Sequence, residues 1–316
     1  MIFTTSESHP PLKTSPQNTQ PMPNKTYDSI RTVYFSPTGT SKKIAQAITR
    51  GIAAPANGST AFTLPGSASR LASQTVDLTR VAEPPAVELP AETVTVIVAP
   101  VYGGRIAPTA VKRLAGIRGS GGPAIIVAVY GNRAFEHAVV ELAGLASRQG
   151  FVPVAAAAFV GEHSYSTPAT PIAAGRPDAQ DLASAEAFGL EVRQKLESGD
   201  ASPIDASQLK DRRAPSLSTL RFIRFVLGYR RQQKRNPVVY LPEGDDDRCS
   251  HCGRCTALCP VGAIPRGDET RTDPARCIRC CACVKGCPTG ARTFHTPFAE
   301  ALSRNFFRRK EPVTLL

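Results

Sequence analysis

The chemistry of this chain is indicated by its cysteines, eight of which fall into two copies of one pattern near the C-terminus. The first copy has the spacing C-x2-C-x2-C-x3-C, ends before a proline, and consists of Cys249, Cys252, Cys255 and Cys259. The second copy repeats the spacing and the proline with Cys277, Cys280, Cys283 and Cys287. Thiolates at this spacing ligate the irons of 4Fe–4S clusters. The sequence therefore predicts two 4Fe–4S clusters and one-electron chemistry.

The ligands of the two clusters are expected to cross between the copies. The last cysteine of each run, three residues further on and beside proline, points away from its own loop and completes the other cluster. One cluster is therefore assigned to Cys249, Cys252, Cys255 and Cys287. The other is assigned to Cys277, Cys280, Cys283 and Cys259. This crossing ties the two halves of the region together and keeps the clusters close.

Other roles for these residues are less favoured. Zinc also takes four thiolates, but usually from two C-x2-C pairs rather than from a triplet and a Cys-Pro. A disulfide framework is disfavoured because eight of the nine cysteines lie in the metal pattern and no secretory signal is visible. Cys281 falls outside the spacing, so we interpret it as a free thiol near the cluster, with a tuning or redox role as the alternative. His251 is not needed as a ligand, because all four thiolates are supplied.

Composition places the chain among globular proteins with two domains. It has 316 residues, 41% of them apolar, and no apolar run of 18 residues, so no transmembrane helix is expected. Residues 1–27 are rich in Ser, Thr, Pro, Gln and Asn and are expected to form a disordered tail, within which Met22 is a hypothetical true start. The tail lacks the apolar segment of a signal peptide, so we expect a cytoplasmic protein.

A hydroxyl-rich turn lies between an apolar run at residues 30–35 and a helical pattern at residues 42–50. The turn carries Ser36, Thr38, Gly39, Thr40 and Ser41. A strand, a turn and a helix N-terminus in this order present backbone N–H groups and the positive helix end to an anion. The turn has neither a Walker pattern nor the glycine spacing of a dinucleotide site. It predicts a phosphate site, with a ligand-free helix cap as the alternative.

Further apolar runs alternate with helical stretches along the first 200 residues. Strands are expected at residues 93–100, 123–130 and 151–160. Helices are expected at residues 108–116, 134–148 and 178–197. This alternation predicts an α/β fold with a doubly wound parallel sheet, in which ligands bind at the carboxyl ends of the strands.

Glycine and aromatic residues follow the predicted strand ends. They are Tyr102, Gly103 and Gly104 after one strand, and Tyr130, Gly131 and Asn132 after the next. Two tyrosines in these places would flank a flat ring while the glycine amides reach its polar edge, which favours a flavin over plain strand-end packing. Residues 161–166 follow the last strand and are expected at the cavity edge, with His163 as a candidate catalytic or flavin contact. A plain loop role for His163 is the alternative.

The stretches YFSPTGTSKKIA, PVYGGRIAPTA and VYGNRAFEHA carry a family resemblance. Residues 28–200 resemble flavodoxin, and residues 28–290 resemble the flavodoxin–ferredoxin fusion proteins. The resemblance implies a flavodoxin-like sheet domain, a smaller α+β ferredoxin domain at residues 241–295, and FMN beside the two clusters. It implies FMN phosphate contacts from residues 36 and 38–41, and isoalloxazine contacts from residues 102–104 and 130–132. Two departures are the absence of tryptophan and of the strongly acidic surface common in small flavodoxins.

Residues 201–240 form a basic connector that neither domain requires. Nine basic and two acidic residues lie between Asp205 and Arg235. Residues 217–235 have helical spacing, which places Arg221, Arg224, Arg231 and Arg235 on one face and an apolar side opposite. The main interpretation is an inter-domain helix that packs its apolar side on the body. The alternatives are docking to an acidic redox partner or to an anionic membrane surface, and nucleic-acid binding is not expected. Residues 296–316 are expected to be a basic tail.

Three functions remain open at the level of sequence. The first is an electron-transfer protein that passes electrons between FMN, the two clusters and a redox partner. The second is an FMN-dependent reductase of a small organic acceptor, fed by its own ferredoxin domain. The third keeps the clusters on a flavin-free scaffold, because fold alone does not establish function.

Overall fold

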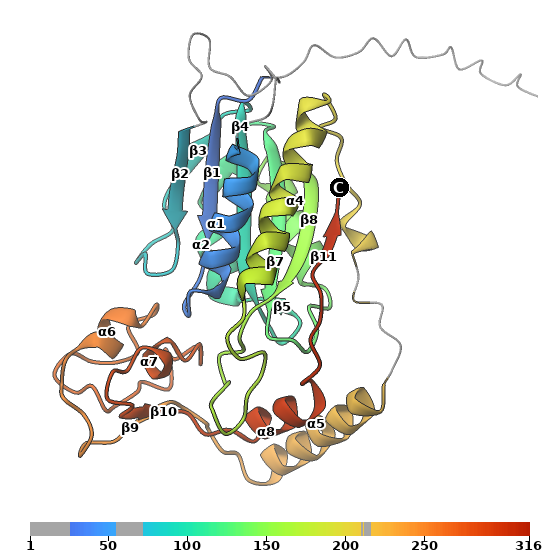
Figure 1. Ribbon diagram of the computed structural model, residues 1–316. Helices are drawn as coiled ribbons and strands as arrows, with labels where there is room; N and C mark the ends of the chain where they lie inside the picture. Colours follow the sequence, from blue (N-terminus) through green and yellow to red (C-terminus); the bar gives the residue numbers. More distant parts are fainter. Residues whose placement is uncertain (1–25, 55–71, 210, 212–215) are drawn as a thin grey trace, which may run out of the picture.

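The computed structural model describes residues 26–54, 72–209, 211 and 216–316 (Figure 1). The hypothesis about Met22 and most of the predicted N-terminal tail lie outside these residues. Tyr27, which the sequence places in that tail, is instead 3% exposed and packs in the core. The ordered fold therefore begins before residue 28, because an aromatic ring there is buried against the sheet.

The centre of the molecule is a mainly parallel sheet, as predicted. The four expected strands are β1 (Ser29–Tyr34), β4 (Thr93–Tyr102), β7 (Pro123–Tyr130) and β8 (Val152–Val160). A further parallel strand, β2 (Ala72–Asp77), pairs with β1, while β5 (Arg105–Ile106) turns back along the end of β4. The parallel strands lie in the order β2-β1-β4-β7-β8. Numbered along the chain this is 2-1-3-4-5, the flavodoxin-like order, so the predicted fold class is confirmed.

Helices cover both faces of the sheet because both sets of alternating strand side chains are apolar. In β4, Val94, Val96 and Val98 face one core, and Ile97 and Ala99 face the other. The first core is closed by α1 (Thr40–Ala53) and α4 (Ala179–Glu197). The second is closed by α2 (Pro108–Leu114) and α3 (Ala138–Arg148). A separate pair of short strands, β3 (Val87–Leu89) and β6 (Ile117–Gly119), extends the second face.

The C-terminal cysteine region forms a small separate unit with little regular structure. Its elements are β9 (Glu243–Gly244), α6 (Arg254–Leu258), α7 (Ala282–Lys285) and β10 (Arg292–Thr293). The antiparallel pairing of β9 with β10 closes the unit. The buried Arg292 guanidinium joins three segments of this unit by donating to the carbonyl oxygens of Pro242, Glu269 and Thr270. Figure 1 places this unit below the carboxyl ends of the parallel strands.

The predicted connector helix is α5 (Leu217–Arg235), and its N-terminus is capped by the Ser216 side chain, which accepts the N–H of Thr219. Its inner side packs on α8 (Pro297–Asn305), a helix in the segment that we expected to be a tail. The last strand, β11 (Val313–Leu315), pairs antiparallel with β8 at the edge of the main sheet. The tail prediction is therefore wrong, because these residues bury side chains and complete a sheet edge.

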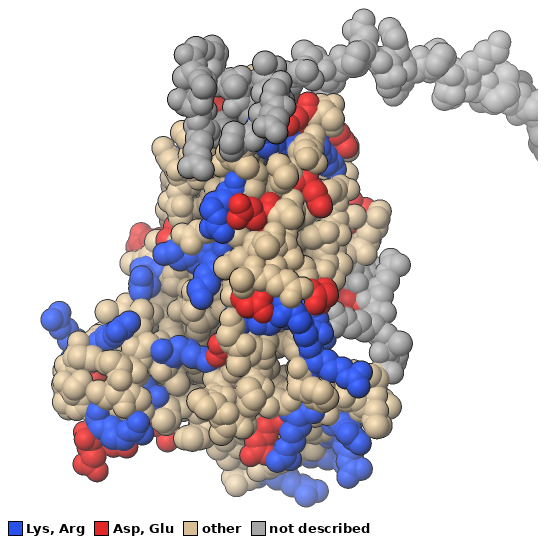
Figure 2. Space-filling view, in the orientation of Figure 1, with Lys and Arg blue, Asp and Glu red and all other residues tan. Residues whose placement is uncertain are grey.

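The outer surface of α5 mixes basic and apolar side chains. Figure 2 shows Lys and Arg gathered over this helix at the lower right. The expected separation into an arginine face and a packed apolar face holds only in part. Phe222 is buried, while Ile223 is 48% and Leu227 52% exposed. Among the helices in the described part of the chain, none is long and apolar enough to span a membrane.

Candidate functional site

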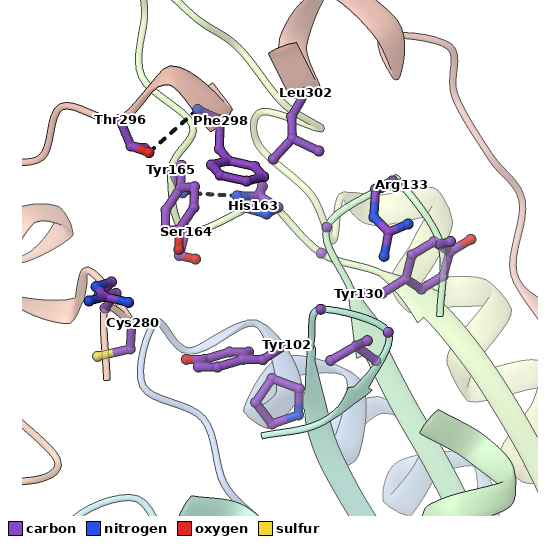
Figure 3. Close-up of a pocket in the computed structure, with 18 of the residues that line it drawn as sticks. Tyr102, Tyr130, Arg133, His163, Ser164, Tyr165, Cys280, Thr296, Phe298 and Leu302 are labelled. Carbon is purple, nitrogen blue, oxygen red and sulfur yellow. Dashed lines mark hydrogen bonds between the residues drawn. The ribbon is translucent and has the colours of Figure 1, made fainter. Parts of the chain in front are cut away.

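One cavity of about 680 Å³ opens at the carboxyl edge of the sheet (Figure 3). Three parts of the chain line it: the loops after β1, β4, β7 and β8, the helices α5 and α8, and the loop of the second cysteine run at Arg279 and Cys280. Its volume lies within the ordinary range for small-molecule and cofactor sites. The predicted phosphate turn, glycine–aromatic loops and cysteine region therefore meet in one place.

The hydroxyl-rich turn has the local geometry of an anion cradle. Ser36 Oγ accepts the N–H of Lys42 at 2.9 Å, which holds the turn against the start of α1. Gly39 caps the helix with a φ of 86°, a left-handed conformation that favours glycine. Ser36, Thr38, Thr40 and Ser41 line the cavity. Gly39 does not line it, and its N–H donates to the carbonyl of Ser36.

Ser41 gives the sharpest sign that an anion belongs there. Its side chain is 1% exposed, lines the cavity, and its Oγ has no hydrogen-bond partner among the described residues. The backbone N–H groups of Thr40 and Ser41 also have no acceptor in the described part of the chain. Buried donors without partners are costly. A phosphate at the N-terminus of α1 would satisfy all three donors, so these residues fit the phosphate of FMN.

Tyr102 lies inside the cavity, at the end of β4 (Figure 3). Burial raises the pKa of its hydroxyl well above the usual value, and the nearby thiols of Cys280 and Cys281 raise it further. The phenol therefore stays neutral and remains a hydrogen-bond donor. Gly103 and Gly104 line the cavity beside it, and both have positive φ values, a conformation that favours glycine in the turn from β4 to β5.

The loop after β7 differs from the expectation at two of its three residues. Tyr130 lines the cavity, but its ring packs edge-on against Phe135, with ring centroids 5.4 Å apart, and lies under the Lys310 ammonium. Asn132 does not line the cavity. Its Nδ2 donates to the carbonyl oxygens of Phe306 and Arg308, so it holds the C-terminal segment. Two tyrosines on either side of a flat ring are therefore not what the structure shows.

Residue 131 is a glycine because the His163 ring packs directly on its backbone. A Cβ atom at residue 131 would lie 2.2 Å from the His163 ring. Nδ1 of His163 accepts the backbone N–H of Tyr165 at 3.0 Å, which leaves the ring proton on Nε2. Burial, together with Arg133 and Lys285, lowers the pKa of His163 to about 4. His163 therefore lines the cavity as a neutral hydrogen-bond donor.

Tyr165 belongs to the loop that was expected at the cavity edge, whereas Phe294 and Phe298 were not identified from the sequence. Tyr165 packs edge-on against His163 and contacts Phe294 with ring centroids 5.0 Å apart. Burial and the Cys281 thiol raise the pKa of Tyr165 to about 12. Phe294 and Phe298 come from the segments around α8. Their positions in the sequence carry no periodic or motif signal, so only the packing of the C-terminal segment reveals them.

The eight cysteines gather in the small C-terminal unit. Cys259 packs against the buried cluster that contains Cys283 of the second run. The last cysteine of the first run thus lies beside the second run, which is the arrangement that the crossed ligand assignment requires. Among the described residues, no three His, Cys, Asp or Glu side chains converge on a single-ion site. A cubane instead offers four separate iron corners to its ligands.

The two cysteine loops are conformational copies of each other. His251 and Arg279, which each precede the second cysteine of a run, have φ values of 50° and 55°. Gly253 and Cys281, which each follow it, have φ values of 69° and 57° and cap α6 and α7. Cys281 thus occupies a left-handed position where the first run has glycine. Its side chain is 1% exposed.

The second cysteine run and Pro260, which follows the first run, lie against the sheet domain. Lys285 of α7 pairs with Glu162 and donates to the carbonyl of Ser166 at 2.7 Å. Arg113 of α2 is 7% exposed and donates to the carbonyl of Pro260 at 2.5 Å. Cys280 lines the cavity, whereas Cys252 of the first run is exposed. The second cysteine run is therefore the one next to the cavity.

Comparison with protein families matches residues 241–295 to the 4Fe-4S dicluster domain. The chain joins a flavodoxin-like domain to a 4Fe-4S dicluster domain. This match supports iron–sulfur chemistry over zinc for the cysteine region. The flavodoxin-like part of the statement rests on the strand order described above.

Solved structures resemble the sheet domain only distantly. A flavodoxin from the domain Archaea is 15% identical, with 54% of this chain and 99% of that chain covered and a TM-score of 0.33. The Flv1 flavodiiron core from Synechocystis sp. PCC6803 is 14% identical, with 57% and 38% covered and a TM-score of 0.36. A flavodoxin, WrbA-like protein from Agrobacterium tumefaciens is 11% identical, with 54% and 98% covered and a TM-score of 0.33. Comparison with curated protein sequences finds no match.

Proposed function

We propose that this chain is an electron-transfer protein with one FMN at the carboxyl edge of the sheet and two 4Fe–4S clusters. The single observation that carries the proposal is that the phosphate turn, Tyr102 and Cys280 line the same cavity. FMN exchanges electrons in pairs or singly, whereas each cluster carries one. A flavin held here and a cluster held by the second run would be neighbours.

The residues of the chain have distinct parts in this function. Ser41 and the N-terminus of α1 would bind the phosphate, and Tyr102 would lie beside the ring system. Arg113 and Lys285 hold the cluster unit against the sheet domain, which fixes the separation between the cofactors. The exposed Cys252 marks the first cluster as the one nearer to an external protein partner. The basic surface of α5 suits a partner with an acidic surface.

The test is an anaerobic cofactor analysis of the purified full-length chain. Iron, acid-labile sulfide and flavin released by acid are measured per chain. Eight irons with one FMN are the expected result, since two cubanes hold about eight irons. Eight irons without flavin would leave a dicluster protein on a flavin-free scaffold and would end the flavin part of the proposal. Fewer than four irons in anaerobically prepared protein would end the cluster part.

A second function, reduction of a small organic acceptor, is favoured by one observation. The cavity has an apolar wall formed by α5 and α8, which lie outside the sheet and outside the cysteine region. A pure carrier exchanges electrons only with proteins, whereas a reductase turns over a small molecule. Anaerobic consumption of reductant that depends on an added small acceptor would distinguish them.

A further inference from the structure

The cavity has a second wall, formed by elements outside the sheet and outside the cysteine loops. Its side chains come from α5, α8 and the residue after β10, and they are Phe222, Val226, Tyr229, Phe294, Phe298 and Leu302. Figure 3 shows Phe298 and Leu302 on the side of the cavity away from Tyr102. Edge-on ring contacts, such as those of Phe298 with Phe225 and Tyr229, stabilise this wall.

This wall does not close over the cavity. Ile223 and Leu227 line it on α5, yet they remain 48% and 52% exposed. A helix that served only to seal the flavin position would bury these side chains, because burial of large apolar groups is favourable. The outer part of the cavity is therefore an apolar mouth that opens to solvent between α5 and the loops of the sheet domain.

The charged side chains at the cavity leave a positive excess. Glu136 pairs with Arg133 at 2.6 Å, and Glu162 pairs with Lys285. Arg230 and Arg279 also line the cavity, and within the described residues neither has a carboxylate partner. A guanidinium is well suited to bind a carboxylate in two places. The mouth thus combines apolar ring surface with available cationic groups.

We infer that the outer part of this cavity binds a small molecule with a flat conjugated ring system and one carboxylate. The rings lie against Phe298, Val226 and Leu227, and the carboxylate meets Arg230 at the mouth. This inference rests on the proposed function, because it places the molecule beside the flavin position and so names the substrate class of that site. The neutral imidazole of His163 is a further donor in the same cavity.

The experiment is a calorimetric titration of the oxidised full-length holoprotein with 2-naphthoate. No reductant is present. Leu227→Asp is compared with Leu220→Asp, which changes a side chain on the same helix that is equally exposed but does not line the cavity. Because an acidic side chain in the mouth repels the probe and removes apolar surface, we expect Leu227→Asp to weaken binding about tenfold or more. Leu220→Asp should leave binding within about twofold of the unmodified chain.

The role of the arginine is tested with a neutral probe. Arg230→Gln should weaken 2-naphthoate about fivefold or more but leave 2-naphthamide unchanged, since an ion pair at a partly exposed site contributes about 1 kcal/mol. Arg231→Gln is the matched control, because Arg231 is the next residue of α5 and does not line the cavity. Equal effects at residues 230 and 231, or at residues 227 and 220, would overturn the inference.

A failure of probe binding can be distinguished from a failure of the proposed function. Flavin and iron are counted on the same preparation, so a failure of the proposed function is read from the cofactors and not from the titration. Protein that contains FMN and shows no binding of 2-naphthoate contradicts this inference alone. In flavin-free protein, competition between added FMN and 2-naphthoate for one site would also overturn it, because the probe would then occupy the flavin position.

Discussion

Ser41 is the residue whose surroundings say most about a bound anion. A serine in the first turn of a helix commonly bonds to nearby backbone, which would make its hydroxyl structural. Here the Oγ is buried without a partner among the described residues, at the wall of the cavity. The neighbouring Ser36 differs, because its Oγ accepts a backbone N–H and so shapes the turn itself.

Ser41→Ala should therefore weaken FMN binding without weakening the fold. A hydrogen bond to a charged group contributes about 1.5–3 kcal/mol, so the Kd of the flavin-depleted protein for FMN should rise about tenfold or more. The measurement is a fluorescence titration with FMN, with Ser207→Ala on the distant surface as the control. An unchanged Kd for Ser41→Ala would remove Ser41 from the phosphate site.

His163 makes stability depend on pH in a defined direction. Its pKa is about 4 in the folded protein against 6.5 for a free histidine. The folded protein takes up a proton on His163 only at lower pH than the unfolded chain does. The contribution of neutral His163 to the free energy of unfolding is therefore complete above about pH 6.5 and is lost as the pH falls toward 4. From about pH 7 to about pH 5, the free energy of unfolding should fall by about 2 kcal/mol through this residue.

The check is urea unfolding under anaerobic conditions at the two pH values. His163→Gln should remove most of this pH-dependent loss, whereas His295→Gln, at an exposed histidine, should retain it. The comparison of the two variants cancels the acid sensitivity of the clusters. The same pH dependence in all three proteins would mean that His163 is not neutral in the fold.

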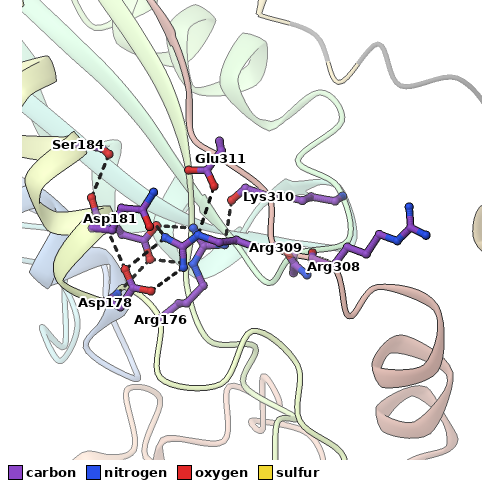
Figure 4. Close-up of polar contacts among 10 residues, drawn as sticks. Arg176, Asp178, Asp181, Ser184, Arg308, Arg309, Lys310 and Glu311 are labelled. Carbon is purple, nitrogen blue, oxygen red and sulfur yellow. Dashed lines mark hydrogen bonds and ion pairs between the residues drawn. The ribbon is translucent and has the colours of Figure 1, made fainter.

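At the scale of elements, residues 306–315 tie α8 to the sheet, and we call this C-terminal segment the strap. It leaves α8, passes over the sheet domain and ends as β11 on the edge of β8. Arg309 fastens it by pairing with Asp178 at 2.6 Å and Asp181 at 3.2 Å, next to the buried pair of Asp181 with Arg176 (Figure 4). The strap keeps α8, and with it the apolar wall, in place.

Arg309→Met should loosen the strap while leaving the sheet domain folded. The amides of β11 should exchange with solvent hydrogen faster, because the ion pairs that anchor the preceding residues are lost. Arg308→Met is the matched control, since the Arg308 side chain points away from this network in Figure 4. Hydrogen exchange with mass spectrometry measures both variants, and equal protection of β11 in both would contradict the strap.

At the scale of the whole molecule, the two cluster sites differ in their relation to the cavity. Cys280 lines the cavity and raises the pKa of Tyr102, whereas Cys252 lies on the outer side of the small unit and is exposed. The two cysteine runs have the same spacing in the sequence but lie at different distances from the cavity. Under the proposed function, the order from the cavity outward would be the flavin, the second cluster and the first cluster.

Removal of a ligand from each cluster tests this order. Cys280→Ser combined with Cys281→Ser, which removes a neighbouring thiol that is able to replace Cys280, should alter the visible absorption of bound flavin. Cys252→Ser should leave the flavin spectrum unchanged, although each variant loses about four irons. Absorption spectra of anaerobic protein with counted iron give the answer. A flavin spectrum perturbed equally in both variants would refute the proposed order.

Local signals were enough for the parts of this protein that depend on neighbours in the sequence. The cysteine spacing determined the cluster chemistry, and the long apolar runs predicted β1, β4, β7 and β8 close to their observed bounds. The Leu217–Arg235 helix was predicted with its observed ends. By contrast, β2 is polar and mostly exposed, and β11 has three residues, so neither carries a hydrophobic pattern.

The contacts between distant segments were decided only by the tertiary structure. Tyr102 and Tyr130 end adjacent strands, but Tyr130 faces the core that Ile126 and Ala128 share, so its ring packs with Phe135 instead. Asn132 donates to the C-terminal segment at Phe306, 174 residues further along the chain, and α5 and α8 form one wall of the cavity at the sheet edge. Spacing determines which residues one loop can present to a metal, because a few bonds join them. Which loops face each other depends on how the cores on the two faces of the sheet and the C-terminal segment pack together. No local sequence pattern predicts that packing.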